Sequence, residues 1–317
     1  MRYAVLGAAG QLGRDLCPRL PGEVVTLSRQ LASFAVPFVE KPRLPGEVVA
    51  LNRTGGPAVD LTRPESLRAV FDEVRPHVVI NCAAYNFVDK AESEPQEAFA
   101  VNAWGVRELA RLCHARDCLL VHFSTDYVFG LDETRRQPWT ESDAPGPVSV
   151  YGLSKLAGEY LVRSLCPRHL VIRTCGLYGV WGSGGKGGNF VETMLRLASQ
   201  GKPLRVVDDQ VCTPSYTVDV AETTVALLAA GRPGLYHVTN SNSCSWYELA
   251  RTIFELAGVQ ADLSPIPSSA YSAPARRPAY SVLDHGALRS LGLASPRPWR
   301  EALAAYLSER SRKTSGK

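Results

Sequence analysis

A glycine-rich turn near the start of the chain constrains the fold more than any other feature. Three glycines recur at a spacing of three residues between an apolar strand pattern and a helical pattern: Gly7, Gly10 and Gly13. Such a turn lets the backbone bend sharply, approach a pyrophosphate and pack a helix closely against its strand. In this context the motif predicts a dinucleotide-binding domain, with Gln11 and Leu12 beside the glycines at the cofactor.

Short β-branched runs alternate with longer helical patterns, which predicts a parallel sheet flanked by helices. The expected strands are residues 3–6, 77–81, 119–123 and 169–173, and the expected helices are 11–20, 97–115 and 150–165. Later helices are expected at 190–199, 218–230, 245–257 and 298–307. We therefore predict an α/β protein with a Rossmann-like doubly wound parallel sheet and a smaller α+β substrate-binding lobe.

The order of these patterns also predicts how the chain is divided. Residues 1–175 would form the nucleotide-binding domain, and part of 215–238 would return to it. Residues 176–310 would form most of the lobe, with a glycine-rich mobile loop at 179–188. Residues 311–317 would be a disordered tail.

One segment is duplicated. The eleven residues from Arg19 to Arg29 recur from Arg43 to Arg53 with nine identities, 24 residues further on. Because only one copy can occupy the second strand of the sheet, the other would form an edge strand or a surface excursion. The sequence leaves open which copy is used.

The end of the second strand bears on the choice of cofactor. An acidic residue there would bind the ribose 2′-hydroxyl of NAD, whereas this chain offers Arg29 or Arg53, which suits a 2′-phosphate. NADPH is therefore favoured, with NADH as the alternative. The other expected cofactor contacts lie at or near strand ends, where open α/β sheets bind ligands: Asp60, Leu61, Ala83, Ala84 and Tyr85.

Tyr151 and Lys155 are the residues that carry chemistry. Tyr151 is the only tyrosine of the chain with a lysine four residues later, which places both on one face of a helix. Reduction of a ketone by hydride requires a proton for the developing alkoxide, and a tyrosine beside an ammonium group can supply it. A hydroxyl at Ser124 or Thr125, at a strand end, would orient the carbonyl oxygen.

Composition limits the partners. A net charge of +4 gives no strong field for nucleic acid or a membrane, and no apolar run approaches the ~20 residues of a membrane helix. The eight cysteines form no C-x-x-C pair and the six histidines show no ligand spacing. We expect a cytoplasmic protein with reduced thiols and no protein-built metal site.

Longer motifs give the chain a family resemblance. They are residues 88–94 (VDKAESE), 124–129 (STDYVF), 207–210 (VDDQ), 213–215 (TPS), 244–247 (CSWY) and 276–278 (RRP). With the glycine turn and the Tyr/Lys pair, these motifs resemble those of the extended short-chain dehydrogenases/reductases. More narrowly, the chain resembles the dTDP-4-dehydrorhamnose reductases.

The resemblance implies reduction by NAD(P)H of the 4-keto group of dTDP-6-deoxy-L-lyxo-4-hexulose to dTDP-L-rhamnose, a precursor of cell-surface polysaccharide. It makes Thr125, Tyr151 and Lys155 the catalytic set. It also implies seven substrate contacts: Val88, Asp126, Tyr127, Asn189, Gln210, Thr213 and Arg277. Members of the family often form homodimers, some of them with Mg²⁺, for which no ligand set is readable in this sequence.

Two departures keep alternatives open. Where the family usually has Ser-Trp-Val-Tyr, with the tryptophan against the sugar, this chain has Cys175-Gly176-Leu177-Tyr178, and Tyr280 replaces a usual asparagine. One alternative is a related reductase or epimerase that acts on another nucleotide-sugar. The other is a non-catalytic NADP-binding regulatory subunit, since fold alone does not establish catalysis.

Overall fold

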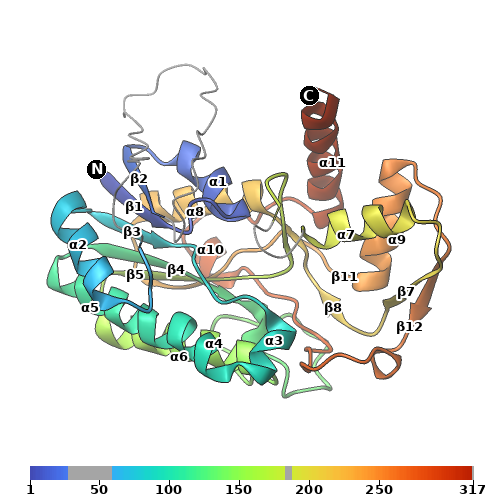
Figure 1. The fold of residues 1–317 in the computed structure, drawn as a ribbon, viewed down its shortest axis with the longest axis horizontal. Coiled ribbons are helices and arrows are strands. Elements are labelled where there is room, and N and C mark those ends of the chain that lie inside the picture. The colour runs from blue at the N-terminus through green and yellow to red at the C-terminus, as the bar shows by residue number, and fades with distance from the viewer. Residues whose placement is uncertain (28–58, 183–187, 316–317) are drawn as a thin grey trace.

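The computed structural model describes residues 1–27, 59–182 and 188–315. Its main sheet has six parallel strands in the order β10-β5-β4-β3-β1-β2 (Figure 1). Their bounds are β1 (Arg2–Leu6), β2 (Glu23–Leu27), β3 (Val78–Asn81), β4 (Leu119–Thr125), β5 (His169–Thr174) and β10 (Gly234–His237). The order reverses direction between β1 and β3, so the sheet is doubly wound as predicted.

Helices cover both faces of the sheet because its strands are apolar on both faces. Figure 1 shows α1 (Gln11–Leu16) and α8 (Thr217–Ala230) on one face, where α10 (Gly286–Ser290) also packs. The other face is covered by α2 (Pro64–Val74), α5 (Val106–Ala115) and α6 (Val150–Leu165). Alternate residues of β1 enter the two cores: Val5 packs towards α1, and Ala4 and Leu6 towards α2 and α5. The predicted fold class is confirmed.

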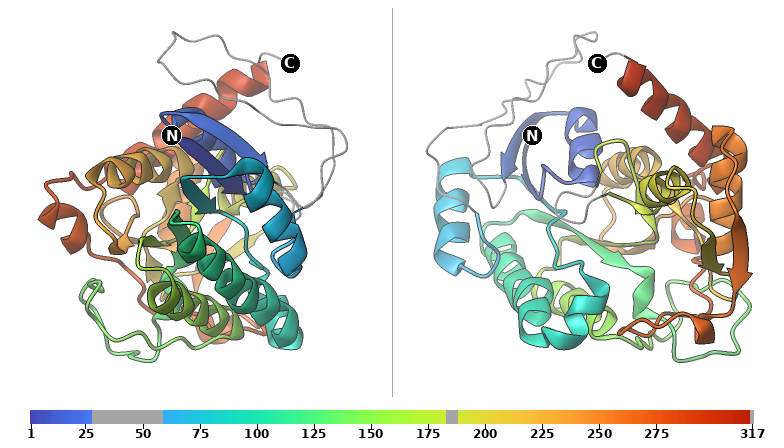
Figure 2. Two further views of the ribbon diagram at one scale, coloured as in Figure 1. Left: turned by 90° about the vertical axis from the view of Figure 1, so that its left-hand side faces the viewer. Right: turned by 45° about the vertical axis from the view of Figure 1, so that its right-hand side comes forward.

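A second group of elements has its own core beside the sheet, at the orange and red end of the chain in Figure 2. Its helices are α7 (Phe190–Ala198), α9 (Trp246–Ala257) and α11 (Trp299–Ser315). Three two-stranded sheets join β6 (Leu177–Tyr178) to β9 (Ser215–Tyr216), β7 (Leu204–Val207) to β12 (Leu263–Ile266), and β8 (Val211–Cys212) to β11 (Cys244–Ser245). These elements correspond to the predicted lobe. α8 and β10 belong to the sheet and its cover and fall within 215–238, the segment expected to return to the nucleotide-binding domain, and α10 also packs on that sheet.

Some local predictions were wrong. The helix expected over 97–115 is not among them: it is present throughout, as α4 (Pro95–Phe99), a π-helical stretch (Ala100–Gly105) and α5, and it follows α3 (Val88–Ser93). The helix expected to reach residue 20 ends at Leu16 and continues as a 3₁₀ turn with proline at position 18. Residues 311–315, expected to be disordered, are the last turn of α11, where Lys313 and Glu309 lie 3.3 Å apart at i,i+4 spacing.

The structure shows which copy of the duplicated segment forms the second strand. β2 belongs to the first copy and pairs with β1 along its whole length. The second copy lies outside the described residues, as do Arg29 and Arg53, the two arginines proposed to bind a 2′-phosphate. No helix in the described part of the chain is long and apolar enough to cross a membrane.

Candidate active site

The glycine turn is closely packed at the carboxyl end of β1. Gly7 has a φ of +73°, and a Cβ atom there would lie 2.8 Å from the amide nitrogen of Ala83. A Cβ on Gly13 would lie 2.6 Å from the carbonyl oxygen of Gly7. Only glycine fits at both positions, because the backbone would otherwise have to move. The turn therefore lies close against the residues that follow β3, as the predicted cofactor site requires.

Replacing Gly7 with alanine is expected to weaken NADPH binding at least about tenfold, because both the left-handed backbone and the contact with Ala83 would distort the turn. The measurement is NADPH affinity by fluorescence titration. Gly258→Ala is the matched control: its φ is +64°, yet no atom lies within 4 Å of the new Cβ. That variant should lose stability and keep its NADPH affinity; equal affinities in the two variants would contradict the assignment.

The start of α1 has the properties of an anion site. Its N-cap is Gly10, which has no side chain to accept from the first amide groups of the helix. The side-chain nitrogen of Gln11 donates to the carbonyl oxygen of Leu177 at 3.0 Å, while its Oε1 atom is buried without a hydrogen-bond partner. Leu12 is a core residue. Uncapped amides and an unsatisfied amide oxygen fit a dinucleotide that lies over this turn.

The remaining cofactor candidates differ in how close they lie to the glycine turn. Ala83 and Ala84 follow β3 beside Gly7, and Ala84 is exposed. Tyr85 turns away towards α4, since its hydroxyl donates to Glu94 at 2.9 Å. Asp60 accepts two hydrogen bonds from Thr62 in the turn before α2. The side chain of Leu61 is part of the core beneath α5. Of these residues, Ala83 and Ala84 lie nearest to the glycine turn.

The predicted catalytic side chains come together at the same edge of the sheet. Thr125 ends β4, and Tyr151 lies in the first turn of α6, whose N-cap Ser149 accepts from the amide of Gly152. Burial raises the pKa of Tyr151 to about 12, and a hydrogen bond with Thr125 opposes this shift. The ring of Tyr127 meets that of Tyr151 edge to face at 5.9 Å. Tyr151 is therefore protonated at neutral pH and able to donate.

Lys155 lies one turn deeper than Tyr151 and is buried. Its Nζ donates to the carbonyl oxygen of Phe123 in β4 at 2.6 Å. Burial lowers the pKa of Lys155 to about 8, and the charge of Glu159 acts in the opposite direction. The ammonium group of Lys155 therefore titrates much closer to neutrality than that of a free lysine.

The activity of the protein is expected to fall as the pH rises above about 8. The pKa of Lys155 is depressed to about 8, so its ammonium form is complete below that pH and is lost above it, whereas Tyr151 keeps its proton to a pKa of about 12. The profile of kcat/KM against pH checks this. An alkaline limb only at pH 10 or above would contradict a lowered pKa of Lys155 as the cause of the loss of activity.

Asp126 is the other buried ionisable group of the site. Its carboxylate accepts from Ser281 at 2.6 Å and from Thr125 at 3.1 Å. Burial raises the pKa of Asp126, and hydrogen bonds from Ser281, Cys175 and Thr125 oppose the shift. Ser281 is 155 residues away in sequence, so Asp126 joins the end of β4 to the lobe. Asp126 is 2% exposed and therefore lies beneath the surface of the site.

The substrate candidates of the lobe mostly have structural partners. Asn189 caps α7 by accepting from the amide of Glu192 and donates to Gly179. The hydroxyl of Thr213 donates to the carbonyl oxygen of Asn242 at 2.9 Å. Gln210 is buried between β7 and β8. Of these three, Asn189 contacts the loop expected at 179–188 through Gly179, and residues 183–187 of that loop lie outside the described residues.

Arg277 and Val88 lie on the side of Tyr127. Arg277 donates to both carboxylate oxygens of Asp89, at 3.0 and 2.9 Å, which ties the segment after α9 to the start of α3. Val88 is the first residue of α3 and partly exposed. Burial raises the pKa of Tyr127, as does the charge of Asp126, while that of Arg277 lowers it. The arginine is thus close enough to influence the tyrosine that faces Tyr151.

The structure also shows what stands at Gly176, where the family tryptophan is absent. Gly176 has a φ of +50°, and its Cβ position is 3.5 Å from Cη2 of Trp246. Trp246 begins α9 and packs its ring against Phe190 at 4.8 Å. An indole from another element therefore occupies the space beside residue 176.

Sequence reasoning missed a buried network behind Lys155. Ser124, which was considered as a ligand for the carbonyl oxygen, instead donates to Glu159 at 2.5 Å, so Thr125 is the hydroxyl that reaches the site. Glu159 also binds Arg173 of β5. The spacing of Glu159, four residues after Lys155, was a signal that could have found it.

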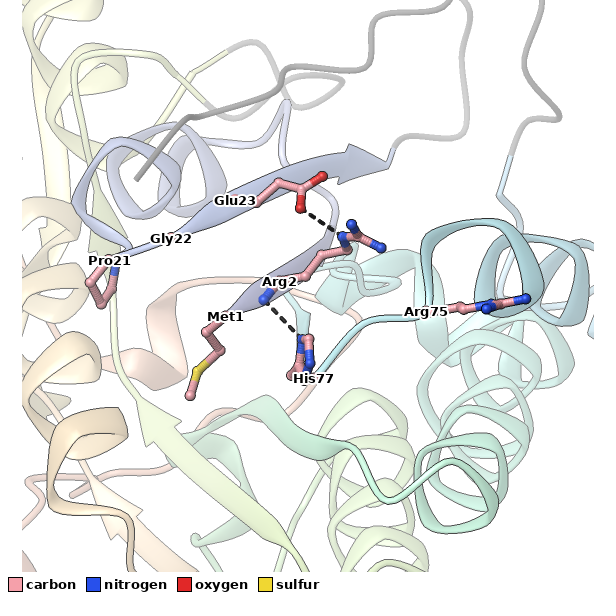
Figure 3. Close-up of a pocket in the computed structure, with 7 residues that line it drawn as sticks. All are labelled: Met1, Arg2, Pro21, Gly22, Glu23, Arg75 and His77. Carbon is pink, nitrogen blue, oxygen red and sulfur yellow. Dashed lines mark hydrogen bonds and ion pairs between the residues drawn. The ribbon is translucent and has the colours of Figure 1, made fainter. Parts of the chain in front are cut away.

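A separate cavity of about 420 Å³ lies at the amino ends of β1 and β2, at the opposite edge of the sheet from the glycine turn (Figure 3). It is lined by Met1, Arg2, Pro21, Gly22, Glu23, Arg75 and His77. None of the predicted site residues lines it. In the residues that the structure describes, no three His, Cys, Asp or Glu side chains are grouped to hold a metal ion.

A doubly wound sheet with a glycine turn and a Tyr/Lys pair at its carboxyl edge defines a reductase fold of the extended short-chain dehydrogenase type. The family model described as the RmlD substrate binding domain matches residues 1–312. The chain belongs to this family. The family predicted from the motifs is confirmed.

Similar proteins extend over nearly the whole chain. A dTDP-4-dehydrorhamnose reductase of Streptomyces griseus is 40% identical over 311 residues, 95% of this chain and 91% of that protein. A dTDP-4-keto-6-deoxy-D-glucose reductase of Streptomyces niveus is 40% identical over 307 residues, 95% of each chain. The crystal structure of dTDP-4-dehydrorhamnose reductase from Bacillus anthracis in complex with NADP superposes with a TM-score of 0.83 at 34% identity, covering 97% of this chain and 99% of that one.

Proposed function

We propose that this protein reduces the 4-keto group of dTDP-6-deoxy-L-lyxo-4-hexulose with NADPH to give dTDP-L-rhamnose, the last reduction in dTDP-rhamnose biosynthesis. The observation that carries the proposal is the meeting of Thr125, Tyr151 and Lys155 at the sheet edge that holds the glycine turn. Relatives of 40% identity that carry this enzyme's name support it. NADP in the similar Bacillus anthracis structure supports the choice of cofactor.

In this proposal Tyr151, Thr125 and Lys155 have different roles in the reduction. NADPH supplies the hydride when it is bound. Tyr151, protonated throughout the neutral range, donates a proton to the oxygen of the former carbonyl, and the hydroxyl of Thr125 orients that oxygen. Lys155 holds its ammonium group beneath the tyrosine, favours the phenolate that forms and positions the nicotinamide ribose.

The sugar that is accepted is the finer part of the proposal. Asp126, Tyr127 and Arg277 would line the sugar and phosphate positions, with Val88 beside them and Asn189, Gln210 and Thr213 on the lobe. The second candidate is a reductase of another dTDP-4-keto sugar, which the Streptomyces niveus relative's name and the Gly176–Trp246 arrangement favour.

The test mixes purified protein, NADPH and enzymatically generated dTDP-6-deoxy-L-lyxo-4-hexulose, and follows the loss of NADPH absorbance. Steady turnover to dTDP-L-rhamnose is expected. A panel of dTDP-, UDP- and GDP-keto sugars separates the two candidates by kcat/KM. NADPH binding without turnover of any sugar would instead favour the non-catalytic regulatory subunit.

Three further expectations belong to this proposal: a homodimer, a cytoplasmic location and no binding of nucleic acid or membranes. The net charge of +4 supports the last of these. Light scattering with Mg²⁺ and with a chelator measures the oligomeric state and shows whether Mg²⁺ changes it.

A further inference from the structure

Three consecutive turns of α6 carry a tyrosine, a lysine and a glutamate. Tyr151, Lys155 and Glu159 are spaced by four residues and so lie on one face of the helix, the face that packs on the ends of β4 and β5. Exposure falls along this row: Tyr151 is partly exposed, Lys155 is 2% exposed and Glu159 is 0% exposed. The row therefore leads from the surface of the site into the core.

Glu159 is fully hydrogen-bonded there. Arg173 of β5 donates from Nε at 2.9 Å to one carboxylate oxygen and from Nη2 at 2.7 Å to the other. Ser124 of β4 donates to the carboxylate at 2.5 Å. Such a carboxylate, with a bidentate guanidinium and a hydroxyl as donors, is held in one position.

Arg173 is held just as firmly. It is 1% exposed, its guanidinium lies 5.0 Å from the centre of the Phe129 ring, and its Nη1 lies 3.5 Å from Nε2 of His237. The ion pair therefore cannot swing towards water. Its anion, Glu159, belongs to the same row of α6 as Lys155, and its cation, Arg173, comes from β5.

The same strand connects this pair to the catalytic groups. Three successive residues of β4 have different partners: the carbonyl oxygen of Phe123 accepts from Lys155, Ser124 donates to Glu159, and Thr125 hydrogen-bonds Tyr151. The other titratable groups that face Lys155 are Cys82 at the end of β3 and His122 on β4. Glu159, one helical turn further along α6, is thus the carboxylate whose charge acts on the buried ammonium group.

We propose that Glu159, fixed by Arg173 and Ser124, is a positioning residue whose charge keeps Lys155 in its ammonium form beside the reaction centre. This inference rests on the proposed function, because it assigns Glu159 a part in the same reduction. A buried ammonium group loses its proton at a lower pH unless an anion opposes the loss. Glu159 supplies that anion without touching substrate or cofactor.

The test is the pH dependence of Glu159→Gln, which keeps the shape of the side chain and removes its charge. The alkaline limb of kcat/KM, expected near pH 8 in the unaltered protein, should move about one pH unit or more towards acid. Activity below the limb should be changed much less. NADPH affinity, measured by fluorescence over the same pH range, should show the same displacement.

Asp219→Asn is the matched control. Asp219 is another buried carboxylate with a bidentate arginine, since Arg297 donates to it at 3.0 and 2.8 Å, and it is not part of the site. This variant breaks a bidentate ion pair that is less buried, with Arg297 37% exposed, and should lower the melting temperature without moving the limb. If the alkaline limb of kcat/KM moved equally in both variants, the effect of Glu159 would be one of general stability, and the proposal would be overturned.

A double variant covers the case in which Glu159→Gln does not fold. Glu159→Gln with Arg173→Met removes both buried charges, and its limb should move in the same direction by less. An unmoved limb in every folded variant that lacks the glutamate overturns the proposal. Absence of turnover in the unaltered protein would contradict the proposed function. NADPH affinity is measured separately, so its pH dependence would still decide the role of Glu159.

Discussion

Replacing Tyr151 with phenylalanine is expected to lower kcat at least about 100-fold while the affinity for NADPH stays nearly unchanged. The variant loses only the hydroxyl that donates the proton. Its ring can still meet Tyr127 edge to face, and Thr125 and Lys155 keep their places on β4 and α6. Steady-state kinetics with the keto sugar and a fluorescence titration with NADPH give the two values.

Tyr160→Phe is the control for this experiment. Tyr160 lies on the same helix, is 51% exposed and has its ring at the surface, so the loss of its hydroxyl should leave kcat unchanged. If Tyr151→Phe kept full activity, Tyr151 would not be the proton donor. A rise in KM for the sugar with unchanged kcat would make it a binding residue instead.

Replacing Arg173 with methionine is expected to cost about 3–5 kcal/mol of the free energy of unfolding, the largest single effect on stability that we predict. The substitution leaves the carboxylate of Glu159, 0% exposed, without its charged partner. Desolvation of an unpaired anion is the physical reason, and lost packing of the guanidinium on Phe129 adds to it. Denaturant unfolding gives the value.

Two comparisons isolate the origin of that loss. Adding Glu159→Gln to Arg173→Met should recover much of the stability, because the stranded charge is then gone. Arg116→Met breaks an exposed pair with Asp72, whose side chains are 43% and 63% exposed, and should cost less than about 1 kcal/mol. Similar losses of unfolding free energy in Arg173→Met and Arg116→Met would show that the buried pair contributes no more to stability than an exposed one.

The fold was predictable where the signal is local. Strand β1, the glycine turn and α6 follow from runs of apolar residues, a turn composition and a period of 3.6 that can be read within ten to sixteen residues. The catalytic set was readable for the same reason, because Tyr151 and Lys155 are one helical turn apart and Thr125 ends a strand.

The failures arise where packing overrides local preference. The segment 97–115 has one continuous helical pattern, yet residues 100–105 are π-helical where they pack against α6. The three small sheets of the lobe were missed because pairs of two residues, such as β8 with β11, carry no periodic signal of their own. The helical end of α11 was missed because its charged residues resemble a frayed tail.

By itself the sequence determined the class of fold and the family, and it singled out the candidate catalytic residues, because each rests on spacing within one element or on a short motif. Only the tertiary structure decided that the first copy of the duplicated segment forms β2 and that Trp246 stands beside Gly176. It alone also showed that Glu159 is buried against Arg173. Contacts between different elements depend on how the sheet is wound and packed, and no local pattern encodes which distant side chains then meet.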